Sequence, residues 1–416
     1  MPERIVITGT GAVSPLGLSA EESWRSAVNG VPGIGPITLF DPSEHLVKMA
    51  CEVKGFKPED YMPAREARRR DRYEQFAAAA AAEAIRMAGL ETGQLDPSRV
   101  GVIVSSAIGG IGSYEEAVED VRTEGPRRIS PFVITMFMPN GAAGMVGIDY
   151  GFRGPSFSVA SACASGADGI GMAWHLLRSE AIDVAVAGAS ESTVTPTGVA
   201  AFDRVGAMSR RNGSNGSAPA APSPFDKERD GLVMGEGAGL LILERESHAR
   251  ARGAEILAEL AGYGSNADAY HITAPSEDGA GGGKAIRSAL EAAGVGLDQV
   301  DYINAHGTAT PLNDLSETRA IKTAFGELAY NIPISSTKSM TGHMMGATAA
   351  LEAVFCTFAV RENVIPPTIN YQHPDPECDL DYVPNEARQK NVRVAVSNAF
   401  GFGGHNAVLV IRKYEG

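Results

Sequence analysis

One cysteine in the sequence stands in surroundings that suit a nucleophile. Cys163 lies in the segment VASACASG, residues 159–166, where every neighbouring side chain is small. A helical pattern begins near Ala164, so we expect Cys163 at the N-terminus of a helix. The positive end of the helix dipole and its free N–H groups favour a thiolate and lower the pKa of the thiol. A lone cysteine is more often a small buried residue, and this segment alone leaves both interpretations open.

Two histidines lie in polar turns that contain glycine. His306 belongs to NAHGTATP and follows an apolar run, whereas His343 ends STKSMTGH and precedes a helical pattern. The N–H groups at a helix start disfavour an imidazolium, so we expect His343 to be neutral and able to donate to a developing oxyanion. Because active-site groups gather where strands end, we expect Cys163 and the two histidines to converge at one edge of a sheet.

The elements that must position these residues are strands alternating with helices. Apolar runs rich in valine and isoleucine, separated by helical patterns, predict an α/β fold with a mostly parallel sheet covered on both faces. A strand, a small-residue turn and a helix recur in both halves, which hints at a duplication. The predicted strands are Arg4–Thr8, Val100–Ser105, Ser156–Val159, Val184–Gly188, Gly239–Leu243, Val300–Asn304, Val392–Ser397 and Ala407–Ile411. The predicted helices are Arg72–Ala88, Asp168–Arg178, Lys284–Ala293, Asp314–Phe325 and Gly346–Arg361.

The composition argues against several functional classes. The 416 residues include 36 Lys and Arg against 50 Asp and Glu, a formal charge of −14. Nucleic-acid-binding surfaces need a surplus of basic residues, so we expect no nucleic-acid partner. Four cysteines without a CxxC pair predict neither a disulfide framework nor a thiolate zinc site. The N-terminal segment has no secretion signal, so we expect a soluble, cytoplasmic protein with free thiols.

Four further segments have compositions that bear on membrane insertion, cofactor binding or disorder. The longest near-apolar stretch, Met344–Val360, contains Glu352, which is costly in lipid, so it predicts a buried helix and no membrane insertion. The glycine-rich segments at 9–14 and 279–284 each depart from the cofactor loops they resemble, so we expect no nucleotide cofactor. Residues 209–224 are of low complexity and predict an exposed loop.

Taken together, the motifs resemble one family specifically. The sequence is similar to the elongating β-ketoacyl-acyl carrier protein synthases, condensing enzymes of the thiolase fold, and most similar to synthase II. The resemblance implies a homodimer with a duplicated five-layer αβαβα architecture and mixed, mostly parallel sheets. It places the nucleophile in an N-terminal half, 1–255, and both histidines in a C-terminal half, 256–416. The matching motifs are ACASG, PFDKERDGLVMGEGAG, DAYHIT, NAHGTATP, STKSMTGH and SNAFGFGGHN.

The resemblance also implies how the central residues act. Cys163 would accept the acyl chain as a thioester, and His306 and His343 would promote decarboxylation of malonyl-acyl carrier protein and stabilise the enolate. Lys338 would orient the histidines and support them electrostatically. The N–H groups of Cys163 and Phe402 would form an oxyanion hole, and Phe402 would also act as a gate.

Other positions carry supporting roles in the resembling family. No metal or cofactor is implied beyond a monovalent cation near Asn304 and Glu352, because the substrates travel on the phosphopantetheine of acyl carrier protein. Val133 stands where relatives often carry a larger aromatic residue, so the preferred chain length is left open. The implied roles are phosphopantetheine binding for Thr308 and Thr310, acyl-pocket lining for Ile108 and Phe202, and polar support for Asp268 and Glu352.

A basic cluster on this acidic chain matches the family positions that meet the acidic carrier protein. A solvated helix face with local acidic partners is the alternative interpretation. The predicted docking residues are Arg65, Arg68, Arg69, Arg127 and Arg128.

Alternative functions remain at this stage. The motifs do not separate a fatty acid synthase from a ketosynthase subunit of a polyketide synthase. A non-catalytic chain-length partner subunit would lack the nucleophile, and Cys163 argues against it. An initiating synthase or a degradative thiolase is disfavoured by His343 and by the absence of cysteine from the C-terminal GFGGHN loop.

Overall fold

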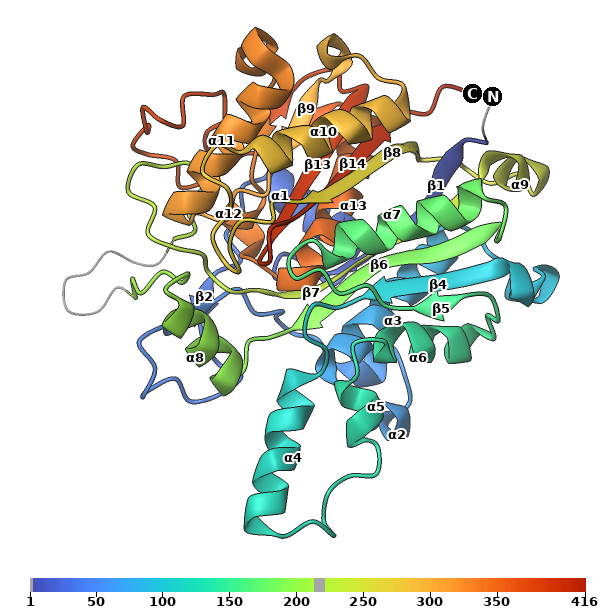
Figure 1. The fold of residues 1–416 in the computed structure, drawn as a ribbon. Helices are drawn as coiled ribbons and strands as arrows, with labels where there is room; N and C mark the ends of the chain where they lie inside the picture. Colours follow the sequence, from blue (N-terminus) through green and yellow to red (C-terminus); the bar gives the residue numbers. More distant parts are fainter. Residues whose placement is uncertain (1–2, 213–220) are drawn as a thin grey trace.

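The computed structural model describes residues 3–212 and 221–416, and its centre is a mixed sheet of ten strands (Figure 1). All eight predicted strands are present, with shifts of their ends. Two short pairs, β2 (Gly35–Pro36) with β3 (Met49–Ala50) and β11 (Val364–Ile365) with β12 (Arg388–Gln389), lie outside it. The strands of the large sheet are β1 (Ile5–Val13), β4 (Val100–Ser105), β5 (Ser156–Phe157), β6 (Val184–Ser192), β7 (Glu236–Arg245), β8 (Ala258–Ala267), β9 (Tyr302–Asn304), β10 (Ile334–Ser335), β13 (Val394–Gly401) and β14 (His405–Arg412).

The large sheet repeats one arrangement twice. From the middle outward, one half runs β1-β7-β6-β4-β5 and the other runs β8-β14-β13-β9-β10. In each half the two inner pairings are antiparallel and the two outer pairings are parallel. The halves join where Val6 and Ile7 of β1 lie opposite Glu259 and Ala258 of β8. The division into halves 1–255 and 256–416 falls between β7 and β8 and stays a proposal.

The prediction of a mixed sheet is confirmed, but parallel pairing does not dominate it. Among the described strands of this sheet, four neighbouring pairs are parallel and five are antiparallel. The strand β14 follows β13 after only three residues, and so short a connection can join only antiparallel neighbours. In the first half β7 likewise pairs antiparallel with β6, the strand before it in the chain, although a long connection separates them.

Helices cover both faces and also separate the two halves. The helices α3 and α6 pack on the outer face of the first half, and α10 and α11 form the outer layer of the second. Between them α7 and α13 pack against each other and against strands of both halves, which completes the five layers (Figure 1). The helices are α1 (Ala20–Val28), α2 (Ala64–Ala67), α3 (Arg72–Met87), α4 (Ile111–Thr123), α5 (Val133–Phe137), α6 (Gly141–Tyr150), α7 (Ser165–Arg178), α8 (Pro196–Val205), α9 (Glu246–Ala251), α10 (Ala280–Ala293), α11 (Pro311–Phe325), α12 (Lys338–Thr341) and α13 (Thr348–Glu362).

The five predicted helices correspond to α3, α7, α10, α11 and α13. Local sequence explains the start of α3 in particular. The Asp71 side chain accepts a hydrogen bond from the Tyr73 N–H group, and the Glu74 side chain accepts one from the Asp71 N–H group. This capping box is followed by an alanine run that favours helix. The patterns did not predict α4, α5 or α6.

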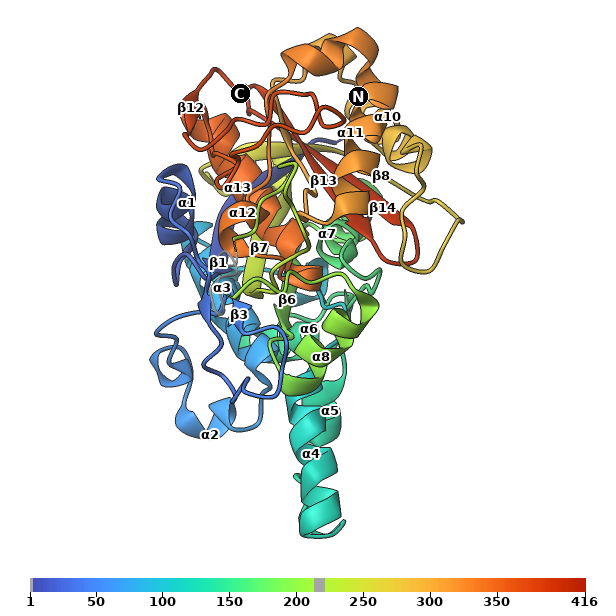
Figure 2. The same ribbon diagram turned by 90° about the vertical axis from the view of Figure 1, so that its left-hand side faces the viewer.

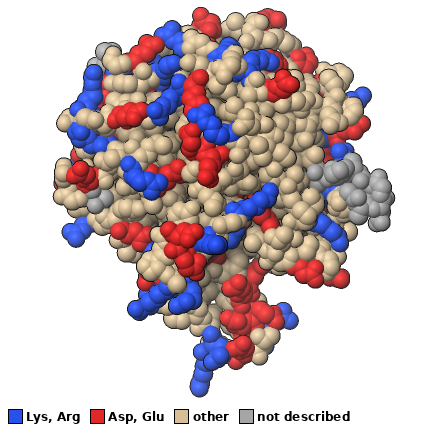
Figure 3. All heavy atoms as spheres, turned by 180° about the vertical axis from the view of Figure 1, so that it is seen from behind, with Lys and Arg blue, Asp and Glu red and all other residues tan. Residues whose placement is uncertain are grey.

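The missed helices α4 and α5 form an arm that projects from the body (Figure 2). We define the projecting arm as residues 111–137. Figure 3, which views the molecule from behind, shows acidic side chains along the arm and basic side chains at its tip. The arm also exposes apolar side chains: Tyr114 is 50% exposed and Ile134 is 64% exposed.

Two predictions about special segments have different outcomes. None of the helices within 3–212 and 221–416 combines the length and hydrophobicity that crossing a bilayer requires. The near-apolar stretch lies mainly in α13, which is buried over almost its whole length. Of the low-complexity loop predicted for 209–224, residues 213–220 lie outside the described residues. The predicted exposure is wrong for part of the remainder, because Ser209 and Ser223 are buried.

Candidate active site

Cys163 lies in a tight turn just before the central helix α7. Its side chain is 8% exposed. The residue before it, Ala162, has φ of +51°, and its carbonyl accepts a hydrogen bond from the Ser165 hydroxyl. A Cβ atom on Gly401 would lie 2.8 Å from the Ser161 carbonyl oxygen, so only glycine allows this close approach. The turn is therefore held by Ser165 at the start of α7 and by the close approach of Gly401 at the end of β13.

The backbone of His343 is fixed by the segment before β7. Its N–H group donates to the Val233 carbonyl at 2.7 Å, and its carbonyl accepts from the Gly235 N–H group at 2.8 Å. Gly342 precedes it with φ of +64°, where a side chain would also press on the buried Cys51 sulfur. His343 is 2% exposed, and α13 begins five residues later.

His306 follows β9 and is held by a buried carboxylate. The N–H groups of His306 and Gly307 donate to the two oxygens of Glu317 at 2.8 and 2.7 Å. The Ser336 hydroxyl donates to the Gly307 carbonyl at 2.7 Å. The two segments that carry the histidines are thus bonded directly to each other.

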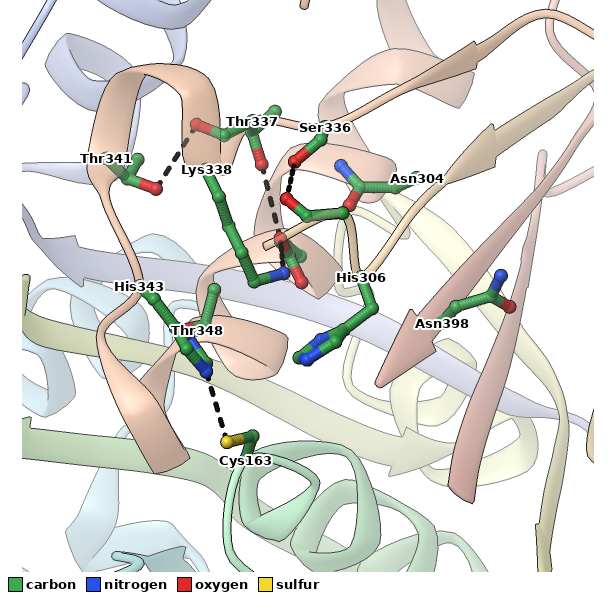
Figure 4. Close-up of polar contacts among 12 residues, drawn as sticks. Cys163, Asn304, His306, Ser336, Thr337, Lys338, Thr341, His343, Thr348 and Asn398 are labelled. Carbon is green, nitrogen blue, oxygen red and sulfur yellow. Dashed lines mark hydrogen bonds and ion pairs between the residues drawn. The ribbon is translucent and has the colours of Figure 1, made fainter. Parts of the chain in front are cut away.

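The side chains of Cys163, His306 and His343 lie together, as the sequence predicts (Figure 4). His343 Nε2 is 3.1 Å from Cys163 Sγ. The rings of His306 and His343 meet edge to face, with centroids 5.3 Å apart. One ligand-type atom from each of the three residues lies within 4.8 Å of the other two. Such a cluster can serve as a nucleophile with two donors, and the same atoms could also hold a soft divalent metal.

The electrostatics of the site confirm part of the expectation and correct another part. Burial lowers the pKa of His343 well below its ordinary value, and the Lys338 ammonium adds to this effect. Burial and the same ammonium act on His306, so both rings are neutral. Burial raises the pKa of the Cys163 thiol to about 11. The expectation of a lowered thiol pKa is therefore wrong for the resting protein, although the N–H groups of Phe402 and Cys163 do act to lower it.

Lys338 lies behind the histidines in an ion pair with Glu352. Lys338 Nζ is 2.7 Å from Glu352 Oε1, and both side chains are almost fully buried. Glu352 Oε2 and the side-chain oxygens of Asn304 and Asn398 are buried and find no hydrogen-bond partner among the described residues. Unpartnered buried oxygens suit an ordered water or a hard cation, so these residues fit the monovalent cation that the resemblance allows.

A cavity of about 290 Å³ leads to the three central residues. Its wall includes Thr308 and Thr310, whose hydroxyl groups are 2.9 Å apart. Phe202 and Phe402 also line it and stack with their ring centroids 6.2 Å apart. The cavity thus combines an apolar wall with a polar pair near its reactive end.

Some residues singled out in the sequence lie outside this cavity. Ile108 is not among its lining residues; its N–H group contacts Glu191. Asp268 accepts hydrogen bonds from the Asn406 side chain and the Ser276 N–H group, so it supports the loop after Phe402 without touching the central cluster.

The residues predicted for docking fall into two groups. Arg65 and Arg68 are exposed on the segment around α2, whereas Arg69 pairs with Glu66 and lies over the Phe132 ring. Arg127 and Arg128 lie in the loop that joins α4 to α5 in the projecting arm, where Arg128 pairs with Glu124.

Besides Glu317, which holds the backbone of His306, two further residues that shape the site were not predicted from the sequence. The buried Glu191 accepts hydrogen bonds from the Ser106 hydroxyl and from the N–H groups of Ala107 and Gly346. It therefore joins the loop after β4 to the loop that follows His343. The Thr348 hydroxyl lies 3.1 Å from His343 Nδ1. A carboxylate at the end of an apolar strand was the available signal for Glu191, and a threonine at a helix start gave none.

Comparisons with known proteins agree on one family. The family model described as "Beta-ketoacyl synthase, N-terminal domain" matches residues 2–249, and the C-terminal domain model matches residues 257–372. The chain is 46% identical to 3-oxoacyl-[acyl-carrier-protein] synthase 2 of Staphylococcus aureus over 413 residues, which covers 99% of each chain. The identity to the protein of the same name from a Synechocystis species is also 46%, with the same coverage.

Solved structures agree with these sequence relatives. A ketosynthase complex of a type II PKS, solved with its acyl-carrier protein, matches with a TM-score of 0.91 and 37% identity over 100% of both chains. A beta-ketoacyl synthase from Burkholderia phymatum matches with a TM-score of 0.90 and 33% identity, over 99% of this chain and 100% of that one.

Proposed function

The chain belongs to the beta-ketoacyl synthase family, and from this membership we propose the reaction that its central cluster carries out. It is an elongating 3-oxoacyl-[acyl-carrier-protein] synthase, a condensing acyltransferase of fatty acid synthesis. The observation that supports this most directly is the buried contact of Cys163 with His343, beside His306, at the end of a partly apolar cavity.

The first half of the reaction is acyl transfer to Cys163. The sulfur attacks the thioester carbonyl of an acyl carrier protein, and the bond to the pantetheine sulfur breaks. The cysteine proton leaves with the departing pantetheine thiol. The N–H groups of Cys163 and Phe402 both act on the sulfur region in the resting site, so they are suited to stabilise the carbonyl oxygen as it becomes negative.

The second half joins two carbon chains. Malonyl-acyl carrier protein loses CO₂, and the electron pair of the broken C–C bond moves onto the thioester oxygen as an enolate. Neutral His306 and His343 donate hydrogen bonds to that oxygen. The enolate carbon attacks the acyl-Cys163 carbonyl, the C–S bond breaks, and a 3-oxoacyl-acyl carrier protein is released. The Cys163 thiolate that leaves takes up one proton from solvent and returns to the thiol. Lys338 supports both rings from behind.

The surrounding residues position the substrate. Thr308 and Thr310 offer hydroxyl groups to the phosphopantetheine arm, and Phe402, stacked on Phe202, is suited to act as the gate. Ile108 does not line this cavity, so its role as an acyl-pocket residue requires a pocket that extends past the gate. We propose Asp268 and Glu352 as supporting residues.

The partners are acyl carrier protein and a second copy of the chain. The homodimer is supported by the apolar side chains on the projecting arm, because a single soluble chain rarely exposes such a patch. In a dimer the loop of the arm with Arg127 and Arg128 would reach another surface, where it would join the docking group of Arg65, Arg68 and Arg69. All four cysteines are free, which suits a reducing cytoplasm.

A ketosynthase subunit of a polyketide synthase is the second candidate. It is favoured by the structural match to a type II PKS ketosynthase, but identity there is 37%, against 46% to the fatty acid enzymes. A chain-length partner subunit, which is a non-catalytic class, is disfavoured because Cys163 and both histidines are assembled. Turnover of acyl-carrier substrates of graded length separates these functions.

The histidine roles are tested by separating the two half-reactions. His306→Ala and His343→Ala should each lower malonyl decarboxylation about 100- to 1,000-fold, the cost of one oxyanion donor. Acyl transfer to Cys163 should persist, because the oxyanion hole and the nucleophile are intact. Radiolabelled acyl transfer and CO₂ release measure the two steps. Normal decarboxylation with a lower melting temperature would make that histidine structural.

A further inference from the structure

The Thr348 hydroxyl contacts the His343 ring on the side away from Cys163. Thr348 Oγ1 is 3.1 Å from Nδ1, whereas Cys163 Sγ is 3.1 Å from Nε2 (Figure 4). Thr348 is 1% exposed and His343 is 2% exposed. Within the described part of the chain, neither this hydroxyl nor this nitrogen has a second hydrogen-bond partner. The two groups therefore depend on each other.

A second buried threonine in the same helix shows the ordinary use of such a hydroxyl. Thr357, also 1% exposed, donates to the Ala353 carbonyl one turn earlier at 2.9 Å. Threonines inside helices commonly bond to the carbonyl four residues back. Thr348 is the first residue of α13, after the turn Met345–Ala347, and its hydroxyl bonds to the ring five residues back instead.

The direction of this hydrogen bond decides which nitrogen of His343 carries the proton. A neutral imidazole has one N–H group, and its partner selects the position. If Nδ1 carried the proton, the Thr348 oxygen would accept a hydrogen bond from the Nδ1–H group. The hydroxyl hydrogen of Thr348 would then be buried without an acceptor, which is unfavourable in free energy. If the hydroxyl donates to Nδ1, the ring proton lies on Nε2, and only the weak Cys163 S–H donor goes without a partner. The second arrangement is the better satisfied one.

We propose that Thr348 is a positioning residue whose hydroxyl donates to Nδ1 of His343 and so holds the ring proton on Nε2. Nε2 faces the sulfur, in the place where an enolate oxygen of the malonyl thioester can form. The nitrogen keeps its proton and donates a hydrogen bond while the C–C bond to CO₂ breaks. The identity of that oxygen rests on the proposed function, but the position of the proton does not.

Three variants separate the hydroxyl from the packing of the side chain. Thr348→Val keeps the shape of the side chain and removes the hydroxyl. Decarboxylation of malonyl-acyl carrier protein should fall about 10- to 100-fold, which is more than the effect of losing one neutral hydrogen bond and less than that of losing an oxyanion donor. Thr348→Ser keeps the hydroxyl and should stay within about threefold of the unmodified enzyme. Thr357→Val is the matched control and should keep full activity. A loss in Thr348→Val that Thr348→Ser does not restore would overturn the proposal, as would full activity in Thr348→Val.

The ring proton can also be observed directly. ¹⁵N spectra of the histidine-labelled protein, with His343 assigned from its absence in His343→Gln, should show Nε2 protonated and Nδ1 bare. The proton should shift toward Nδ1 in Thr348→Val. A proton on Nδ1 in the unmodified protein would overturn the proposal, even if Thr348→Val failed to fold. Absence of malonyl decarboxylation in the unmodified protein would instead refute the proposed function, and the spectrum would still decide the tautomer.

Discussion

The ammonium of Lys338 and the carboxylate of Glu352 form an ion pair whose members, 2.7 Å apart, are both almost fully buried. Removal of one member of such a pair leaves the other charge without compensation, which typically costs about 3 to 5 kcal/mol. The pair therefore holds α12, and the segment that leads to His343, against α13.

The first prediction follows from this pair. Lys338→Met and Glu352→Gln should each lower the free energy of unfolding by about 3 to 5 kcal/mol. The double variant should lose clearly less than the sum, because no isolated charge remains. Denaturant titrations of the four proteins measure this coupling. Additive losses would mean that the two charges do not interact.

The second prediction concerns the reactivity of Cys163. Since burial raises its thiol pKa to about 11, the thiolate fraction at neutral pH is small and should grow about tenfold per pH unit between pH 7 and 10. Alkylation by iodoacetamide should rise in the same proportion. Cys51, whose pKa burial raises to about 12, lies outside the cavity and should label far more slowly. Peptide mapping at several pH values measures both rates. Equal labelling of the two thiols, or a plateau below pH 8, would contradict this picture.

The third prediction concerns docking. The chain carries a formal charge of −14, so an acidic carrier protein needs a local basic surface to approach it. Changing Arg68 and Arg69 to Glu should raise the apparent KM for malonyl-acyl carrier protein, most strongly at low salt, because screening acts over about 10 Å at 0.1 M.

Two controls separate docking from chemistry. A small pantetheine thioester carries no acidic surface, so its turnover should hardly change in the Arg68 and Arg69 variant. Lys284→Glu reverses an exposed charge on α10 and should leave the KM for the carrier protein unchanged. Equal loss with both substrates would assign the arginines to the fold; Arg69, which lies over Phe132, is the residue to examine first.

The fourth prediction concerns a buried acid at the start of α3. Burial raises the pKa of Glu74 to about 8, and its Oε1 atom has no hydrogen-bond partner in the part of the chain that the structure describes. A raised carboxyl pKa means that the folded state favours the neutral acid, so this group's stabilising effect is complete below its unfolded pKa of about 4.3 and is lost as pH rises toward 8. Glu74→Gln resembles the neutral acid. It should be more stable than the unmodified protein at pH 9, by a few kcal/mol at about 1.4 kcal/mol per pKa unit, and by only about 1 kcal/mol at pH 5. Thermal unfolding at both pH values tests this; an equal effect at pH 5 and pH 9 would refute it.

The sequence predicted the strands rich in valine and isoleucine, but it did not predict β8. That strand contains glycines because α10 lies directly on it: a Cβ atom on Gly262 would be 2.4 Å from the Ala289 carbonyl oxygen. Glycine weakens the local strand signal, so the close packing that requires it also conceals the strand from pattern analysis.

The residues of the site could be predicted from the sequence, but the burial that sets their protonation could not. Motifs brought Cys163, His306 and His343 to attention, but the thiol pKa depends on burial among segments distant in the sequence. The role of Glu191 likewise appears only when the loops after β4 and after His343 meet. Local sequence specifies which groups are present, and tertiary packing decides their protonation.

The repeated strand order has a chemical consequence. Cys163 follows β5 and precedes α7, whereas His343 follows β10 and precedes α13. Because β5 and β10 are the outermost strands of the two halves, the two residues occupy equivalent positions in the repeated fold. An exactly symmetric pair of halves would place like against like at that junction, two thiols or two imidazoles. Neither combination unites a nucleophile with a donor. Carrying both copies on one polypeptide frees each to mutate separately, and that broken symmetry lets a sulfur face an imidazole across 3.1 Å.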